Sequence, residues 1–94
     1  MKADYDSEAN ALAIELTDVD RWDDGDGFDE DYCELGFLKG HLVYVGLLNP
    51  RENLHLLEAV AESYDLDVGS LIAVAKAALA APDQLVTIGD RLAA

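Results

Sequence analysis

The spacing of the apolar residues changes at Asn49-Pro50, and this change limits the fold class more than any other feature. Before it, apolar side chains recur at every second residue, as in Leu12, Ile14 and Leu16, which is the period of a strand with one buried face. After it, they recur at every third or fourth residue, which is the period of a helix. The order of strands followed by helices indicates an α+β fold.

Four segments have the pattern of strands, at residues 2–6, 11–17, 32–37 and 42–48. A short polar turn joins the first two, so they are expected to form a hairpin. The segment 42–48 is apolar on both faces, which is typical of a central or covered strand. We therefore expect a small antiparallel β-meander of about four strands, with helices on one side and another cover on the other.

Two helices are expected after the proline. The first begins near residue 51 or 53 and ends at Tyr64, and the second begins after Asp67, which has the character of an N-cap, and ends near Ala81. The segment 84–88 fits a short final strand. At 94 residues the chain fits one domain, with a sheet part over 1–48 and a helical part over 49–94.

The second helix is apolar on all sides, and Lys76 is its only charged residue. A helix of this kind must be buried, and a domain this small has little core in which to bury it. This predicts burial between subunits, as a homodimer or a docking surface. The candidate interface residues are Leu71, Ile72, Val74, Ala75, Ala78 and Leu79.

The charge is strongly negative and uneven. The net charge is −14, and 13 of the 20 acidic residues lie in the first 34 positions. Such a surface repels nucleic-acid phosphates and anionic membranes, and it favours basic partners, cations or simple solubility. The single cysteine allows no internal disulfide, and the acidic start, Met1 to Asp6, lacks the features of a signal peptide. We therefore expect a cytoplasmic protein with no direct nucleic-acid or membrane binding.

An acidic segment over residues 18–31 interrupts the strand pattern and is expected to be a loop. It contains Trp22 and Phe28, which either pin the loop to the body or act as anchors for a partner. The hypothesis we favour is a non-enzymatic interaction module that docks a basic protein partner; the other reading is a merely solvated loop. The candidate partner-binding residues are Asp18, Asp20, Trp22, Asp23, Asp24, Asp26, Phe28, Asp29, Glu30 and Asp31.

Two other functions fit the same acidic segment. One is an acidic mimic of nucleic acid, such as an antitoxin-like inhibitor, and the other is a weak divalent-metal domain or small enzyme. An EF-hand alignment with Gly27 at position six places Trp22 first and Cys33 twelfth, so the motif fails at both ends. Cys33, His41 and His55 lack the spacing of zinc ligands. We expect no catalytic residues, metal site or cofactor.

A resemblance adds to this reading. The run from Tyr5-Asp6 to Leu16, and the turn and strand from Gly40 to Leu48, resemble the bacterial domain-of-unknown-function 2283 family over residues 2–48. The chain departs from that family at Tyr44-Val45-Gly46, where members usually carry Gly-Ile-Glu. The resemblance implies a small meandering sheet and no particular activity. It is compatible with structural roles for the motif residues, with Tyr5 in the core and Asp6 and Asn10 in the turn.

Overall fold

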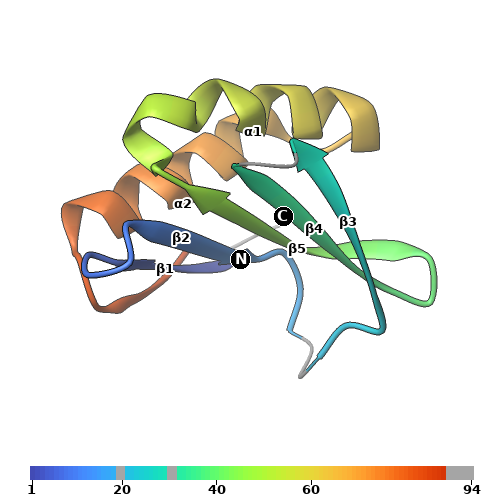
Figure 1. The fold of residues 1–94 in the computed structure, drawn as a ribbon, viewed down its shortest axis with the longest axis horizontal. Helices are drawn as coiled ribbons and strands as arrows, with labels where there is room; N and C mark the ends of the chain where they lie inside the picture. Colours follow the sequence, from blue (N-terminus) through green and yellow to red (C-terminus); the bar gives the residue numbers. More distant parts are fainter. Residues whose placement is uncertain (19–20, 30–31, 89–94) are drawn as a thin grey trace.

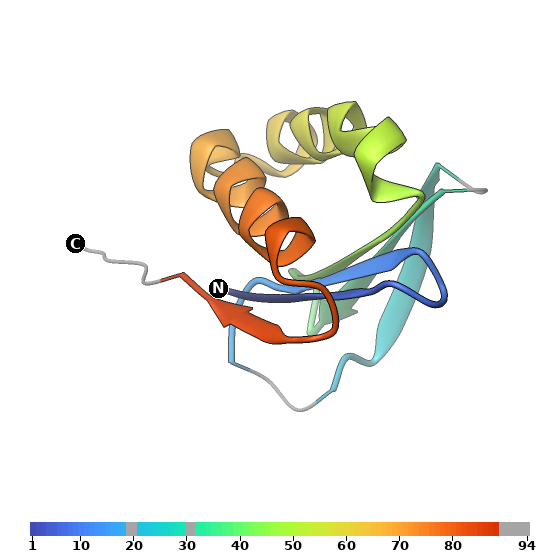
Figure 2. The same ribbon diagram turned by 90° about the vertical axis from the view of Figure 1, so that its left-hand side faces the viewer.

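A computed structural model describes residues 1–18, 21–29 and 32–88. Within these residues, six strands form one antiparallel sheet in the order β3-β4-β5-β2-β1-β6, and two helices lie together on one of its faces (Figures 1 and 2). The α+β class, the antiparallel sheet and the two helices are confirmed. The elements are β1 (Lys2–Asp6), β2 (Ala11–Glu15), β3 (Asp24–Asp29), β4 (Cys33–Leu38), β5 (His41–Leu48), α1 (Pro50–Tyr64), α2 (Val68–Ala80) and β6 (Leu85–Thr87).

The β1–β2 hairpin is closed by side chains of the motif that carries the family resemblance. The Asp6 carboxylate accepts hydrogen bonds from the backbone N–H groups of Glu8 and Ala9, at 3.0 and 3.2 Å. The Tyr5 hydroxyl donates to Asn10 Oδ1 at 2.6 Å, and Asn10 has a positive φ of 52° that suits a tight turn. The expected structural roles of Tyr5, Asp6 and Asn10 are therefore confirmed.

The main difference from expectation is β3, a strand within the segment that the sequence analysis treats as a loop. Asp24–Asp29 pairs with β4 in antiparallel register, with one irregularity between Gly27 and Asp29. The exposed carboxylates of Asp24 and Asp26 are tolerated because β3 is an edge strand, where they oppose further strand pairing. The sheet therefore has six strands rather than about four and a final one.

Both helices begin and end close to the expected residues. α1 begins at Pro50 after Asn49, whose backbone is left-handed, and Asp65 ends it in the same conformation. Asp67 is the N-cap of α2, and its carboxylate accepts from Gly69 N and from the Ser70 hydroxyl, at 3.3 and 2.6 Å. No helix in the described part of the chain is both long and apolar enough to cross a lipid bilayer.

The core is a single layer between the helices and one face of the sheet. α2 packs against β1 and β2, and α1 packs against α2 and β5. Every second residue of the central strands points into this layer. The fully buried side chains of largest volume are Leu12, Ile14, Leu35, Leu47, Leu57, Leu71, Val45, Val60 and Val74, with Pro50.

The structure corrects the reason for expecting a dimer. Five of the six candidate interface residues, Leu71, Val74, Ala75, Ala78 and Leu79, are buried within one chain, and Ile72 is partly buried against the same core. The outer side of α2 consists of small or charged residues such as Ala73, Lys76 and Ala80. Because the sheet and α1 bury the apolar side of α2, the helix does not require a second subunit. A dimer stays a prediction without that support.

A glutamate at Ala75 should unfold the chain. Ala75 has no exposed surface, and an unpaired buried carboxylate costs several kcal/mol, roughly the whole stability of a small domain. Ala73→Glu makes the same change on the exposed side of the same helix and should leave the melting temperature within a few degrees. Circular dichroism and light scattering measure both outcomes. If Ala75→Glu folds as a monomer while the wild type is a dimer, the hypothesis that α2 forms the subunit interface is supported after all.

Candidate binding site on the open face of the sheet

The face of the sheet opposite the helices is covered by neither helix (Figure 2). Strand alternation decides which side chains lie there, because their neighbours in sequence point into the core. Strand pairing aligns them in rows across the sheet, and one row runs from Glu34 through Gly46 and Ala13 to Asp4. The next row contains Gly25, Gly36, Tyr44, Glu15 and Lys2.

Small residues make this face hollow. Gly46, Ala11 and Ala13 lie at its centre, with Gly25 and Gly27 on the β3 side, and they leave a depression of about 680 Å³. That volume is in the range of small-ligand and peptide-side-chain pockets. Larger side chains at these positions would fill the depression.

Tyr44 lines the hollow, and Trp22 stacks on it, so the two rings form an aromatic shelf at one side of the hollow. Their rings are nearly parallel, with an interplanar angle of 17° and centroids 5.5 Å apart. A Cβ on Gly36 would lie 2.6 Å from Trp22 Cδ2, and one on Gly25 would lie 2.9 Å from Trp22 Cζ3. The indole therefore rests directly on the backbone of β3 and β4, which only glycine permits.

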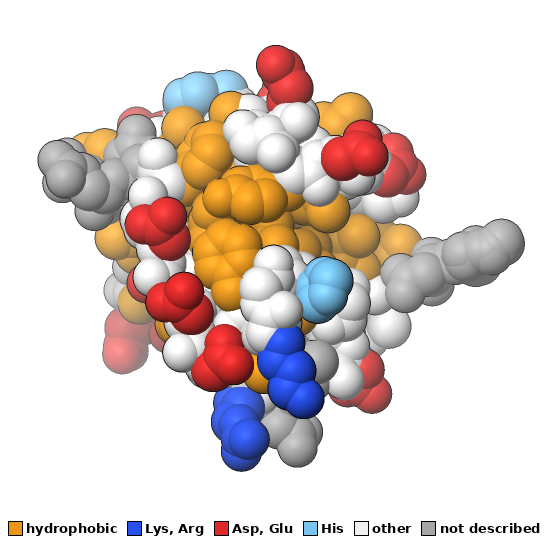
Figure 3. Space-filling model, turned by 90° about the vertical axis from the view of Figure 1, so that its right-hand side faces the viewer, with side chains coloured by type: hydrophobic (Ala, Val, Ile, Leu, Met, Phe, Trp, Pro, Cys, Tyr) orange, Lys and Arg blue, Asp and Glu red, His pale blue; other side chains and the backbone are white. Residues whose placement is uncertain are grey.

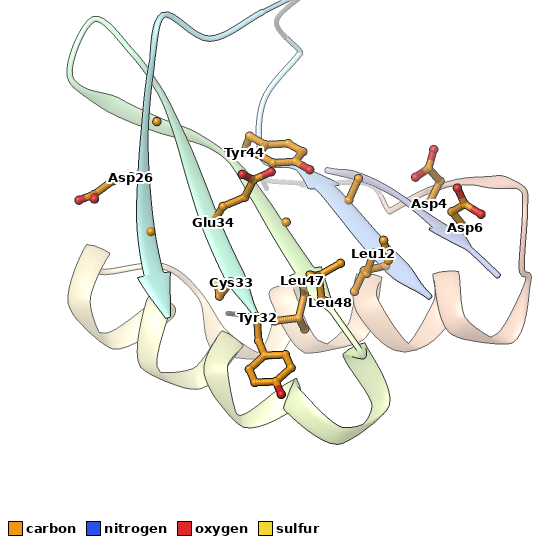
Figure 4. Close-up of a pocket in the computed structure, with 15 residues that line it drawn as sticks. Asp4, Asp6, Leu12, Asp26, Tyr32, Cys33, Glu34, Tyr44, Leu47 and Leu48 are labelled. Atoms are coloured by element: carbon orange, nitrogen blue, oxygen red, sulfur yellow. The ribbon is translucent and has the colours of Figure 1, made fainter. Parts of the chain in front are cut away.

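The Tyr44 phenol extends over the next glycine. A Cβ on Gly46 would lie 2.8 Å from Tyr44 Oη and 3.2 Å from Glu34 Cγ. The phenol and the Glu34 side chain thus converge over Gly46, and Figure 4 shows them side by side across β4 and β5. This places a carboxylate beside an aromatic ring at one end of the hollow.

Acidic groups surround the hollow. Asp4 and Asp6 project from β1 at the end opposite Glu34 and Tyr44 (Figure 4), whereas the Asp26 carboxylate points away from it. No lysine or arginine is among the described residues that line the hollow. Lys2 on β1 forms an ion pair with Asp18, with Nζ and Oδ1 3.5 Å apart. The hollow is thus suited to a cationic ligand.

The position of Tyr44 raises its pKa above the ordinary value of 10.0. Burial is the largest cause, because it disfavours the phenolate, and the nearby negative charges of Glu34, Asp4 and Glu15 add to it. Tyr44 therefore stays protonated in the physiological range. It presents a neutral ring and a hydroxyl to the hollow.

The candidate residues of the acidic segment lie in different environments. Trp22 lies on the open face and helps to form the site, whereas Phe28 packs against the core and is not available as an anchor. Asp18, Asp23, Asp24 and Asp26 are exposed, and Asp29 ends β3. Asp20, Glu30 and Asp31 lie outside the described residues.

Sequence reasoning missed Tyr44, Glu34, Asp4 and Asp6 as site residues. They occupy outward positions of three different strands, so only the strand pairing brings them to one face. The sequence feature that could have indicated this site is Tyr44, an aromatic residue on the second apolar face of its strand. Cys33 is buried in the core, and His41 and His55 are exposed on β5 and α1.

Within residues 1–18, 21–29 and 32–88, no group of three or more His, Cys, Asp or Glu side chains is arranged to hold a metal ion.

A different side of the molecule shows gathered hydrophobic side chains (Figure 3). Phe37 of β4 and Tyr64 of α1 are in ring contact, with centroids 5.8 Å apart. That contact connects the end of α1 to the β4–β5 hairpin.

Comparisons with known proteins returned no relatives. No family model matches the chain, and neither a curated protein nor a solved structure matches it. The resemblance to the domain-of-unknown-function 2283 family therefore stays a prediction.

Alanine at Gly36 should displace Trp22 from the sheet. The added Cβ would lie within 2.9 Å of three indole atoms, and such overpacking costs about 1–3 kcal/mol unless the ring moves away. Since Trp22 is the only tryptophan, its fluorescence emission should shift to longer wavelength. Gly69→Ala adds the same methyl group in ordinary contact with Asp67 and should leave the emission unchanged. Wild-type emission from Gly36→Ala would show that the indole does not rest on β4.

The pKa of Tyr44 makes stability fall at high pH. The unfolded chain releases this phenol proton near pH 10, before the folded chain does. The free energy of unfolding should thus be unaffected by Tyr44 below pH 10 and fall as the pH rises from there through the folded pKa. In Tyr44→Phe, the free energy of unfolding, measured with urea below and above pH 10, should fall less with pH than in the wild type. Tyr64→Phe is the control, and an unchanged pH profile in Tyr44→Phe would contradict the effect.

Proposed function

We propose that the chain is a non-enzymatic, cytoplasmic interaction module that binds a basic polypeptide segment on the open face of its sheet. The observation that carries the proposal is the hollow, whose described lining includes the Tyr44 ring and the carboxylates of Asp4, Asp6 and Glu34 but no basic residue, with Trp22 stacked on Tyr44 at its side. Aromatic rings supply contact area and cation–π attraction, and carboxylates supply charge complementarity.

This proposal moves the binding site away from the tip of the acidic segment. Trp22 contributes from the sheet surface, and Phe28 is occupied by the core. The exposed acids of the segment then act at longer range, by raising the local concentration of a basic partner. The site is complete within one chain, so binding does not depend on a dimer.

The test compares two double variants that remove the same charge. Asp4→Asn with Glu34→Gln removes two carboxylates of the open face, and Glu58→Gln with Glu62→Gln removes two exposed carboxylates of α1. The site pair should weaken binding of a short arginine- and lysine-rich peptide about tenfold, because two exposed ion pairs contribute up to about 1 kcal/mol each. Calorimetry at low and raised salt measures the affinity.

The control pair should keep the affinity within about twofold, and raised salt should weaken wild-type binding. Equal losses in the two pairs would show that only net charge attracts the peptide, and the site proposal would fall. If a protein that binds duplex DNA also binds the chain, and the basic peptide does not compete with it, the chain acts as a nucleic-acid mimic instead of a basic-segment binder.

A further inference from the structure

We infer that the hollow selects an extended segment carrying an arginine and a second basic residue four positions away, with the arginine seated on the Tyr44–Trp22 shelf beside Glu34. This inference rests on the proposed function and deepens it by naming the ligand. It depends on three features of the open face: the flat aromatic shelf, the carboxylate next to it, and the distance to the acids of β1.

The shelf favours arginine over lysine. Trp22 lies close over Gly36, the hydroxyl end of Tyr44 lies close over Gly46, and the two rings stack on each other beside the sheet backbone. The near-parallel arrangement of the rings suits the flat guanidinium, which stacks on aromatic faces and is less strongly hydrated than an ammonium. The same pairing occurs inside this chain, where the Arg51 guanidinium carbon lies 5.4 Å from the Tyr5 ring centroid.

Glu34 is positioned to orient the guanidinium. Its Cγ and the Tyr44 hydroxyl oxygen both approach the same point above Gly46. A guanidinium stacked on the phenol can therefore direct N–H groups at the Glu34 carboxylate, in the planar pairing that arginine forms and lysine does not.

The spacing of the basic residues follows from the strand pairing. Glu34, Gly46, Ala13 and Asp4 are register partners across β4, β5, β2 and β1. Three strand intervals separate Glu34 from Asp4, or about 14 Å, and four residues of an extended chain span about 13 Å. Residues four apart in an extended chain also point to the same side.

The floor between these two ends accommodates the ligand. Gly46 and Ala13 are the small residues of that row, so the backbone of an extended segment can approach the sheet between its two basic side chains. Leu48 and Tyr32, at 47% and 40% exposure, provide apolar contact beside the path. Asp4 and Asp6 then meet the second basic residue at the β1 end.

The experiment titrates the wild-type protein with peptides of equal length and net charge, followed by Trp22 fluorescence and calorimetry. The peptides carry two arginines four positions apart, two lysines four positions apart, or two adjacent arginines. We expect the arginine peptide with spacing four to bind about fivefold or more tightly than the lysine peptide, because a guanidinium stacks on the rings, and more tightly than the adjacent-arginine peptide, whose second arginine does not reach the acids of β1.

Protein variants assign the preference to the shelf. Tyr44→Leu should abolish the difference between arginine and lysine, Tyr44→Phe should retain it, and Tyr64→Leu, which changes an exposed tyrosine of α1, should not affect it. Asp4→Asn should reduce the advantage of spacing four. If Tyr44→Leu does not fold, Glu34→Gln makes the same test by reducing arginine binding more than lysine binding.

The outcomes separate this inference from the proposed function. Equal affinity for the arginine and lysine peptides, or for the two spacings, overturns the inference while basic-segment binding stands. If both Tyr44→Leu and Glu34→Gln still prefer arginine, the arginine does not bind on the Tyr44–Trp22 shelf. If no basic peptide binds the wild type at any salt concentration, both proposals fall.

Discussion

The packing of α2 against β1 and β2 determines the rest of the architecture. Because the helix lies on the sheet with Leu71, Val74 and Ala78 fully buried, the sheet face beneath it must be apolar and buried. Strand alternation then assigns every other residue to the opposite face. Most residues that line the hollow are therefore ones that the core does not use, although the core residues Leu12, Cys33 and Leu47 also border it.

Glycine has a second role on that open face. Gly36 and Gly46 stand where a methyl group would collide with Trp22 and Tyr44, so the sheet accepts the two rings directly on its backbone. A flat aromatic surface held in this way loses little conformational freedom when a ligand arrives, since the rings are already placed. Tyr44 supplies one ring, and Gly46 supplies the space beneath its hydroxyl end.

The local elements could be predicted from the sequence, and the long-range ones could not. The β1–β2 hairpin, the Asp67 cap and both helices depend on neighbouring residues, and their patterns were recognised. The strand β3 depends on pairing with β4 and on Trp22, so its Asp and Gly residues resembled a loop. The site shows the same limit: Trp22 was named as a candidate, but Glu34 and Asp4 become neighbours of one hollow only through the pairing of four strands.

The concentration of acid on the open face has an energetic consequence. The carboxylates of Asp4, Asp6, Glu15 and Glu34 lie on one face of the sheet, on β1, β2 and β4, and like charges gathered there repel one another. Solvent and salt reduce that repulsion without removing it. A basic ligand that lies across these strands converts the repulsion into attraction, so its binding is coupled to the stability of the sheet itself.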